Sequence, residues 1–208
     1  MPVSTSQTPD FKRIYIRALH LPGVHKIYFS SIITEYSDTW TPKWTPANVY
    51  GRMDPISFYS TTSREMTLGF RVISDDKAEA SMNMTKLQKL IQWQYPSYVT
   101  GRHSGQSILK APPYLGIRFM NILGGGGELQ GYINGALQIN PGFQSKDNIQ
   151  YFEHDNDSPG KIYFSDVNIV LRMQILHQRK VGFTNRFKPN SKYPYGVEDS
   201  DVQEAVAS

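Results

Sequence analysis

The 208-residue sequence contains no cysteine. Disulfides, thiolate metal sites and thiol nucleophiles are therefore excluded, so stability must come from packing or from partner subunits. No stretch reaches the roughly 18 uninterrupted apolar residues of a membrane span, and the start MPVSTSQTPDFKR lacks the apolar segment of a signal peptide. We expect a soluble protein that is made in the cytoplasm and does not insert stably into a membrane.

Signatures of catalysis are also missing. The five histidines form no pair at the helical spacing of a zinc hydrolase, and no Gly-x-Ser-x-Gly marks a serine hydrolase. The glycine run 124–127 is followed by Glu128 instead of the Lys-Ser/Thr of a phosphate-binding loop, which favours a hairpin tip. We predict a protein that is not an enzyme and that holds no cofactor.

One segment has part of the pattern of a calcium-binding loop. Asp155, Asp157, Gly160 and Asp166 fall at its positions 1, 3, 6 and 12. Pro159 occupies the ligand position 5, an aspartate replaces the bidentate glutamate, and the flanking segments do not have helical periodicity. We therefore predict that no calcium ion is bound here.

The residues that are present indicate a folded, aromatic-rich β protein. Hydrophobic residues make up 39% and charged residues 19% of the chain, a balance that excludes the disordered class. Apolar and polar residues alternate with the period of a half-buried strand in several segments. The predicted strands are 25–35, 64–73, 115–123, 129–140 and 162–176. A turn-rich stretch with two prolines, 37–48, predicts a long loop.

A helix is expected at about 76–95. Asp76 and Glu79 have the spacing of a capping box, apolar residues then recur every three to four positions, and Pro96 follows Tyr95. The predicted fold class is α+β, mainly antiparallel β, with this one main helix. We predict a single domain over 11–195, a flexible N-terminus at 1–10 and a flexible acidic tail at 196–208.

Charge is distributed unevenly along the chain. The last 13 residues hold four of the 18 acids and no base, whereas all 22 lysines and arginines precede them. A basic C-terminal arm at 172–192, called the basic segment below, carries six bases and no acid: Arg172, Arg179, Lys180, Arg186, Lys188 and Lys192. It could bind a nucleic-acid backbone or dock on an acidic protein partner, and we favour the partner because like charges left unpaired repel one another.

The most specific motif is Tyr50-Gly51-Arg52-Met53-Asp54-Pro55-Ile56, followed by Thr61, Thr62 and Arg64. With the strand before it, the helix ending in QWQYP and the strand start KAPPYLGIRF, it resembles tube-like baseplate hub and tail-tube initiator proteins of contractile-tailed phages and related injection systems. The likeness spans roughly 26–177. It implies a small tail-tube-like antiparallel barrel or sandwich with one helix, in a structural protein of the virion.

Long strands that each have one polar and one apolar face favour closure of several copies into a homo-oligomeric ring around a central channel. The resemblance implies sixfold symmetry for this ring, with threefold symmetry as the alternative. Its partners would be further copies and the neighbouring tail tube, spike or hub, and baseplate wedge proteins, with DNA passing through the lumen. Polar strand faces would line that lumen, and their residues are Thr67, Arg71, Asn134, Gln138, Asn168 and Gln174.

Residues Gly51, Arg52, Met53, Asp54 and Pro55 form a candidate interface loop. Gly51 permits a turn, Pro55 restricts Asp54, and Arg52 could bracket the loop by a charge-assisted hydrogen bond to Asp54. Turn residues of this kind are common, so an ordinary tight turn stays an alternative to an assembly contact.

Two other functions are open. A small barrel with aromatic faces could bind single-stranded nucleic acid. Trp40, Trp44 and Trp93 could instead belong to a cell-surface carbohydrate binder or a peptidoglycan hydrolase, although the sequence positions no carboxylate pair for hydrolysis.

Overall fold

The structure is a computed structural model. It describes residues 13–100, 107–123, 127–145, 148–149, 151–153, 160–178, 181 and 194–195. The predicted termini 1–10 and 196–208 lie outside the described residues. In the described part, no helix is long and apolar enough to span a membrane.

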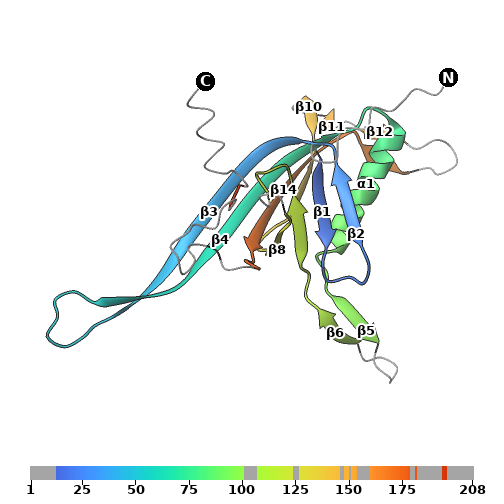
Figure 1. Cartoon of the computed structure of the whole chain (residues 1–208). Helices are drawn as coiled ribbons and strands as arrows, with labels where there is room; N and C mark the ends of the chain where they lie inside the picture. Colours follow the sequence, from blue (N-terminus) through green and yellow to red (C-terminus); the bar gives the residue numbers. More distant parts are fainter. Residues whose placement is uncertain are drawn as a thin grey trace, which may run out of the picture.

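One large antiparallel sheet organises the chain (Figure 1). Its strand order is β2-β1-β7-β8-β14-β4-β3, with β9 also pairing with β14. These strands are β1 (Ile14–Ala18), β2 (His25–Phe29), β3 (Ile32–Ala47), β4 (Ile56–Ile73), β7 (Leu115–Arg118), β8 (Leu129–Ile133), β9 (Gln138–Pro141) and β14 (Asp166–Ile175). The α+β, mainly antiparallel fold class is therefore confirmed.

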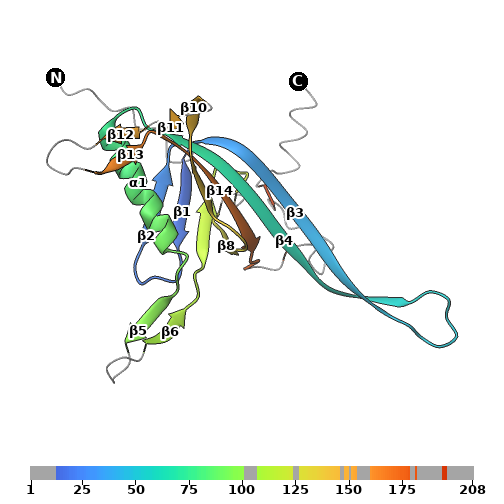
Figure 2. The same ribbon diagram turned by 180° about the vertical axis from the view of Figure 1, so that it is seen from behind.

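Three two-stranded ribbons accompany the sheet. They are β5 (Ser97–Thr100) with β6 (Ser107–Ala111), β10 (Phe143–Ser145) with β11 (Asn148–Ile149), and β12 (Tyr151–Glu153) with β13 (Ile162–Phe164). The β5–β6 ribbon extends from the end of α1 away from the sheet (Figures 1 and 2).

The core lies on one face of the sheet because strand residues alternate between buried and exposed. In β4 the buried residues Met66, Leu68, Phe70 and Val72 alternate with polar ones, and β14 repeats this pattern. The two strands pair over ten residues, from Asp166 opposite Ile73 to Ile175 opposite Arg64. Both therefore direct their apolar side chains into the same core.

The helix α1 (Lys77–Gln92) begins as predicted. The Asp76 side chain accepts a hydrogen bond from the Glu79 N–H at 2.7 Å, and the Glu79 carboxylate accepts one from the Asp75 N–H at 3.1 Å. Leu87 and Leu90 are buried in the core, beside β2. The helix thus covers the β2 end of the core (Figure 2).

Several strand predictions need correction. The predicted strand 25–35 breaks between β2 and β3, and the predicted strand 115–123 ends at Arg118 of β7. The predicted loop 37–48 is mostly strand, because β3 runs on to Ala47. The predicted strand 129–140 is interrupted after Ile133, and β8 and β9 pair with different parts of β14. The predicted strand 162–176 breaks at Ser165, where β13 leaves the large sheet.

Candidate functional site: a hairpin arm and its buried root

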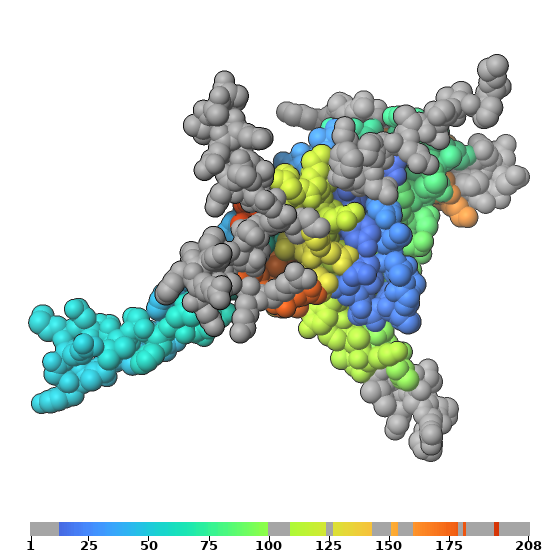
Figure 3. Space-filling view, in the orientation of Figure 1, coloured from blue at the N-terminus to red at the C-terminus, as the bar shows by residue number. Residues whose placement is uncertain are grey.

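Beyond the sheet, β3 and β4 continue together as a projecting hairpin. β14 pairs with β4 only from Arg64 to Ile73. In contrast, β3 pairs with β4 from Ile32 to Ala47, which lies opposite Ile56. We call residues 41–63 the hairpin arm. Its paired part is about 25 Å long at the usual rise of an antiparallel strand, and the arm stands clear of the body (Figure 3).

The hairpin arm exposes large apolar side chains. Tyr50 and Met53 at its tip are fully exposed, and three aromatic residues along it are more than half exposed: Trp44, Phe58 and Tyr59. The Trp44 and Tyr59 rings meet edge-on across the two strands, with their centroids 5.4 Å apart. An isolated two-stranded ribbon is only marginally stable in water. An exposed surface of this kind is typical of a contact with another molecule.

The predicted interface loop forms the tip of the hairpin arm. Gly51 has a φ of 85°, which favours glycine, and the Arg52 N–H donates to the Val49 carbonyl at 3.2 Å. The residues from Gly51 to Pro55 are all exposed. Within the described part of the chain, no hydrogen bond or ion pair joins the Arg52 and Asp54 side chains. The expected charge-assisted hydrogen bond between them is therefore absent from the structure.

A buried ion pair lies where the hairpin arm leaves the sheet. Arg64 is completely buried and binds Asp38 with two hydrogen bonds, Nε to Oδ1 at 2.9 Å and Nη2 to Oδ2 at 2.5 Å. The Tyr36 hydroxyl donates to the same carboxylate at 3.0 Å. The Trp40 ring lies 4.9 Å from the guanidinium. We call these four residues the root cluster.

The root cluster fixes the arm to the body. Burial removes the hydration of a guanidinium, and here the carboxylate of Asp38 and the ring of Trp40 take the place of that water. Arg64 is directly opposite Trp40 in the β3–β4 pairing, and its carbonyl accepts a hydrogen bond from Gln174 of β14 at 3.1 Å. The Tyr195 ring meets the Trp40 ring edge-on at 6.4 Å. The same residues therefore connect β3, β4, β14 and the C-terminal segment.

Two pKa values reflect this environment. Burial, followed by the charge of Asp38 and the hydrogen bond to it, raises the pKa of the Tyr36 hydroxyl. Burial, followed by the charge of Arg64, lowers the pKa of His177. Both groups therefore favour their neutral forms in the folded protein.

Sequence reasoning did not identify the root cluster, although one signal was present. Arg64 continues the alternation of the core residues Met66, Leu68 and Phe70, so its side chain must point into the core. A buried arginine requires an anionic partner. Only the fold shows that this partner is Asp38.

No protein-family model matches this chain, and no curated protein is similar to it in sequence. The arrangement of its own residues is therefore the main basis for an interpretation of its function.

The face of the sheet opposite the core is polar and rich in arginine and tyrosine. Strand pairing places Thr67, Arg71, Asn168, Gln174 and Gln138 on this one face, while Asn134 follows the end of β8. Arg71 binds Asp166 and Arg17 binds Glu128. The Arg118 guanidinium lies 5.5 Å from the Tyr15 ring. Most residues predicted to line a lumen thus share one surface.

The basic segment begins inside the last strand, in the region that the predicted strand 162–176 shares with it. Arg172 pairs with Thr67 inside β14, which runs on to Ile175, so its exposed side chain belongs to the polar face. The other five bases, Arg179, Lys180, Arg186, Lys188 and Lys192, lie outside the described residues.

Metal binding has no support in the described ranges, where no group of three metal-ligating side chains occurs. Asp166 of the calcium-loop pattern binds Arg71 instead. Asp155 and Asp157 are outside the described residues, so the absence of calcium stays a prediction.

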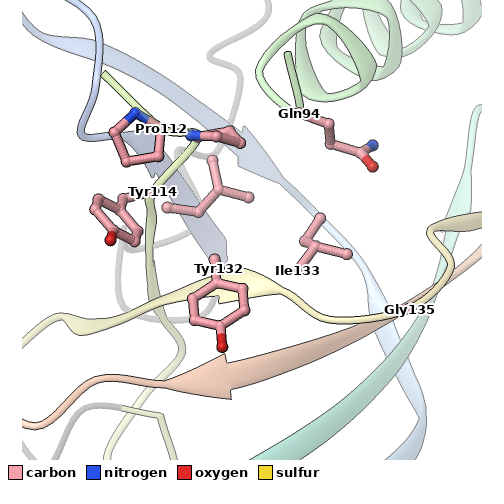
Figure 4. Close-up of a pocket in the computed structure, with 8 residues that line it drawn as sticks. Gln94, Pro112, Tyr114, Tyr132, Ile133 and Gly135 are labelled. Carbon is pink, nitrogen blue, oxygen red and sulfur yellow. The ribbon is translucent and has the colours of Figure 1, made fainter. Parts of the chain in front are cut away.

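A pocket of about 310 Å³ lies where the polypeptide enters β7. Figure 4 shows Pro112, Tyr114, Tyr132 and Ile133 around it, with Gln94 from the segment after α1. The described residues that line this pocket carry no charge, which suits a small apolar or ring-shaped group better than acid–base chemistry.

Proposed function

We propose that this chain is a structural subunit of a contractile phage tail or a related injection system, in the hub or tube-initiator layer of the baseplate. Its copies form a ring around the central channel, sixfold rather than threefold. The ring connects the tail tube with spike or hub and wedge proteins. In this function the protein acts in the virion through contacts and catalyses no reaction.

The observation that carries this proposal is the pair of free edges on the large sheet. β2 and β3 occupy opposite ends of the strand order, and each has one neighbour within the described part of the chain. Free strand edges pair readily with other chains. If β3 of one copy pairs with β2 of the next, a closed ring leaves no edge unpaired.

The composition of β3 limits where this pairing occurs. Pro42 and Pro46 lie on the arm and have no N–H to donate. The part of β3 at 32–40 contains no proline and lies beside the body of the sheet. This part is therefore the edge that suits a neighbouring copy, while the hairpin arm extends past it to a further subunit or layer.

Ring closure would also give the polar face a role. Thr67, Arg71, Asn168 and Gln174 lie opposite the apolar core residues of the same strands. With the core face covered by side chains and α1, the polar face would line the channel. A hydrated channel wall suits the passage of DNA or of a spike.

Cross-linking in assembled particles tests the ring, because the native chain has no cysteine. A Tyr28→Cys/Ser37→Cys variant places one thiol on β2 and one on β3, both on the polar face. We expect bridges between copies that build a ladder up to the ring size. Pairing Tyr28→Cys with Met82→Cys, on an exposed helix position, is the control.

Electron microscopy of the same particles provides the second readout. We expect a closed ring of this chain with its β2 and β3 edges paired. Isolated peripheral copies without strand pairing between them would overturn the proposal.

Single-stranded nucleic-acid binding is the second candidate, and the polar face favours it. Arg118 against Tyr15 and Lys26 against Tyr28 combine cations with rings on which bases could stack. Arg17 and Arg71, however, already bind carboxylates. Titration with short oligonucleotides at several salt concentrations separates the two functions, because backbone binding weakens steeply with salt.

A further inference from the structure

One edge of the hairpin arm has no neighbouring strand. In the body, β4 pairs with β3 on one side and with β14 on the other, but β14 ends opposite Arg64. From 56 to 63, the outer side of β4 therefore has no strand beside it in the described part of the chain. We call this side the β4 arm edge. It comprises eight residues and is about 27 Å long.

The two edges of the arm differ in composition. The β3 edge contains Pro42, Lys43 and Pro46, which are residue types that keep other strands from pairing with an exposed edge. The β4 arm edge has the sequence ISFYSTTS, which contains no proline and no charge and is rich in residues that favour strands. An exposed, uncharged edge of this kind pairs readily with a further strand.

The chain that follows β14 contains a segment suited to this edge. Residues 182–188 have the sequence GFTNRFK, in which Phe183, Asn185 and Phe187 alternate with threonine, arginine and lysine. This alternation is typical of a strand with one apolar face, and Pro189 would end the strand. Seven residues span about 23 Å in a strand, which is close to the length of the β4 arm edge.

Both ends of this part of the chain are held at the root of the same arm. Ile175 pairs with Arg64, and the Tyr195 ring packs edge-on against Trp40, which lies directly opposite Arg64. The 20 residue steps from Ile175 to Tyr195 allow an excursion of about 34 Å from the root and back. The β4 arm edge begins at this root and lies within that distance, so no second copy is needed to supply the strand.

We propose that residues 182–188 add to the β4 arm edge of their own chain as a third strand, antiparallel to β4 and in line with β14. Pro189 then ends the strand beside the outer part of the arm, and the chain returns to Trp40. The six steps from Pro189 to Tyr195 span about 20 Å, and so do the six from Pro46 to Trp40 along β3. The outward and the return path are therefore matched in length.

The added strand would bring most of the basic segment to the arm. The arm itself has a net charge of +1, from Lys43, Arg52 and Asp54. The chain between Ile175 and Tyr195 adds five bases and no acid. The interface loop and the basic segment then belong to one basic surface, which suits an acidic protein partner. Only this choice of partner rests on the proposed function, because the strand addition joins residues of one chain.

Hydrogen exchange of the full-length protein tests the added strand. Thr184→Pro/Asn185→Pro removes two successive N–H groups, and successive residues of a strand direct these groups to opposite sides. One of the two lost donors therefore faces β4 in either register. We expect the outward amides of 57–63 to exchange about tenfold faster than in the parent protein. The amides of 66–72, which lie between two paired strands, should be unchanged.

The matched control is Asn190→Pro/Ser191→Pro, which places two prolines in the returning part of the chain. The outward amides of 57–63 should remain protected in this variant. Exchange that is equally fast in the parent and in Thr184→Pro/Asn185→Pro would overturn the inference. Equal loss of protection in both proline variants would overturn the assignment to 182–188.

Cross-linking tests whether the strand comes from the same chain. Thr61→Cys/Thr184→Cys introduces the only two thiols, because the native chain has no cysteine. We expect a short bismaleimide to join them within one chain, so that the product keeps the mass of a monomer. Mixtures of chains that carry one substitution each should give few bridges. If bridges form only between chains, a neighbouring copy supplies the strand and the inference is wrong.

This inference and the proposed ring fail separately. A bridge within one chain, without a ladder from Tyr28→Cys/Ser37→Cys particles, would overturn the ring and leave the added strand standing. A ladder together with an unprotected β4 arm edge would leave the ring standing and overturn the added strand.

Discussion

At the scale of single residues, the root cluster places two opposite charges in the interior of the protein. The Arg64 side chain is 0% exposed and that of Asp38 is 3% exposed, so both charges are removed from water. Desolvation of such a pair costs several kcal/mol, which their attraction and hydrogen bonds must offset. Each partner is therefore stable in the core only while the other is present.

Replacing Asp38 with alanine should leave Arg64 buried without its carboxylate. We expect the free energy of unfolding to fall by about 3–5 kcal/mol in urea denaturation. The control is Glu128→Ala, which removes the partner of the one-third-exposed Arg17 and should cost about 1 kcal/mol or less. Equal losses in both variants would show that Arg64 does not depend on Asp38.

Alkaline pH provides a second test at this scale. The pKa of Tyr36 is raised above its ordinary value of 10.0 in the folded protein. The neutral hydroxyl is thus favoured by folding, and this contribution is present below pH 10 and lost as the pH rises above it. We expect melting temperatures measured from pH 8 to pH 11 to fall less steeply in Tyr36→Phe than in the parent protein. Parallel curves would contradict this assignment.

At the scale of elements, the hairpin arm is a rigidly anchored extension without a hydrophobic core of its own. Its root is fixed by Arg64, whereas its tip contacts nothing else in the described chain beyond the turn itself. Changes at the tip should therefore affect partners more than folding.

We expect Tyr50→Ser/Met53→Ser to change the free energy of unfolding by less than about 0.5 kcal/mol. Incorporation into assembled particles should fall by about tenfold or more if the tip is an interface anchor. Asp54→Ala should likewise reduce assembly more than folding. The fraction of each variant in purified particles, compared with its urea unfolding, measures both effects.

The control for the tip is Met82→Ser/Tyr98→Ser, which removes the same two types of side chain from α1 and β5, where they are 58% and 62% exposed. Incorporation of this variant should be unchanged. A tip variant that assembles normally would restrict the loop to the role of an ordinary turn.

At the scale of the whole molecule, the fold separates a stable centre from surfaces that suit other chains. β14 lies at the middle of the large sheet and pairs with β4, β8 and β9. It ends at Ile175, so the sheet is complete before most of the basic segment begins. The C-terminal residues can then serve partners without being required for the core.

Ending the chain after Gln178 should therefore leave a folded protein that fails to join its partner. We expect a loss of about 1 kcal/mol in stability, because the Tyr195 ring no longer contacts Trp40. Tyr195→Ala in the full chain should show the same stability loss but retain partner binding. Particle incorporation and thermal unfolding distinguish these outcomes, and normal incorporation of the truncated chain would refute the role of the basic segment.

The sequence by itself determined the features that depend on neighbouring residues. The capping spacing of Asp76 and Glu79 predicts the start of α1, and the strict alternation in β4 and β14 predicts which side chains are buried. Helix and strand periodicity place residues on faces without reference to the rest of the chain. The mainly antiparallel class with one helix follows from these patterns.

Only the tertiary structure decided the features that join distant residues. Pro42 and Pro46 predict a loop, but both lie in the edge strand β3. On the outer side of an edge strand no neighbouring strand accepts a backbone hydrogen bond, so a missing N–H there removes none. The Arg64–Asp38 pair links residues 26 positions apart, and the order of strands sets β2 and β3 at opposite edges. Alternation shows that a residue is buried, whereas its partner depends on non-local strand pairing.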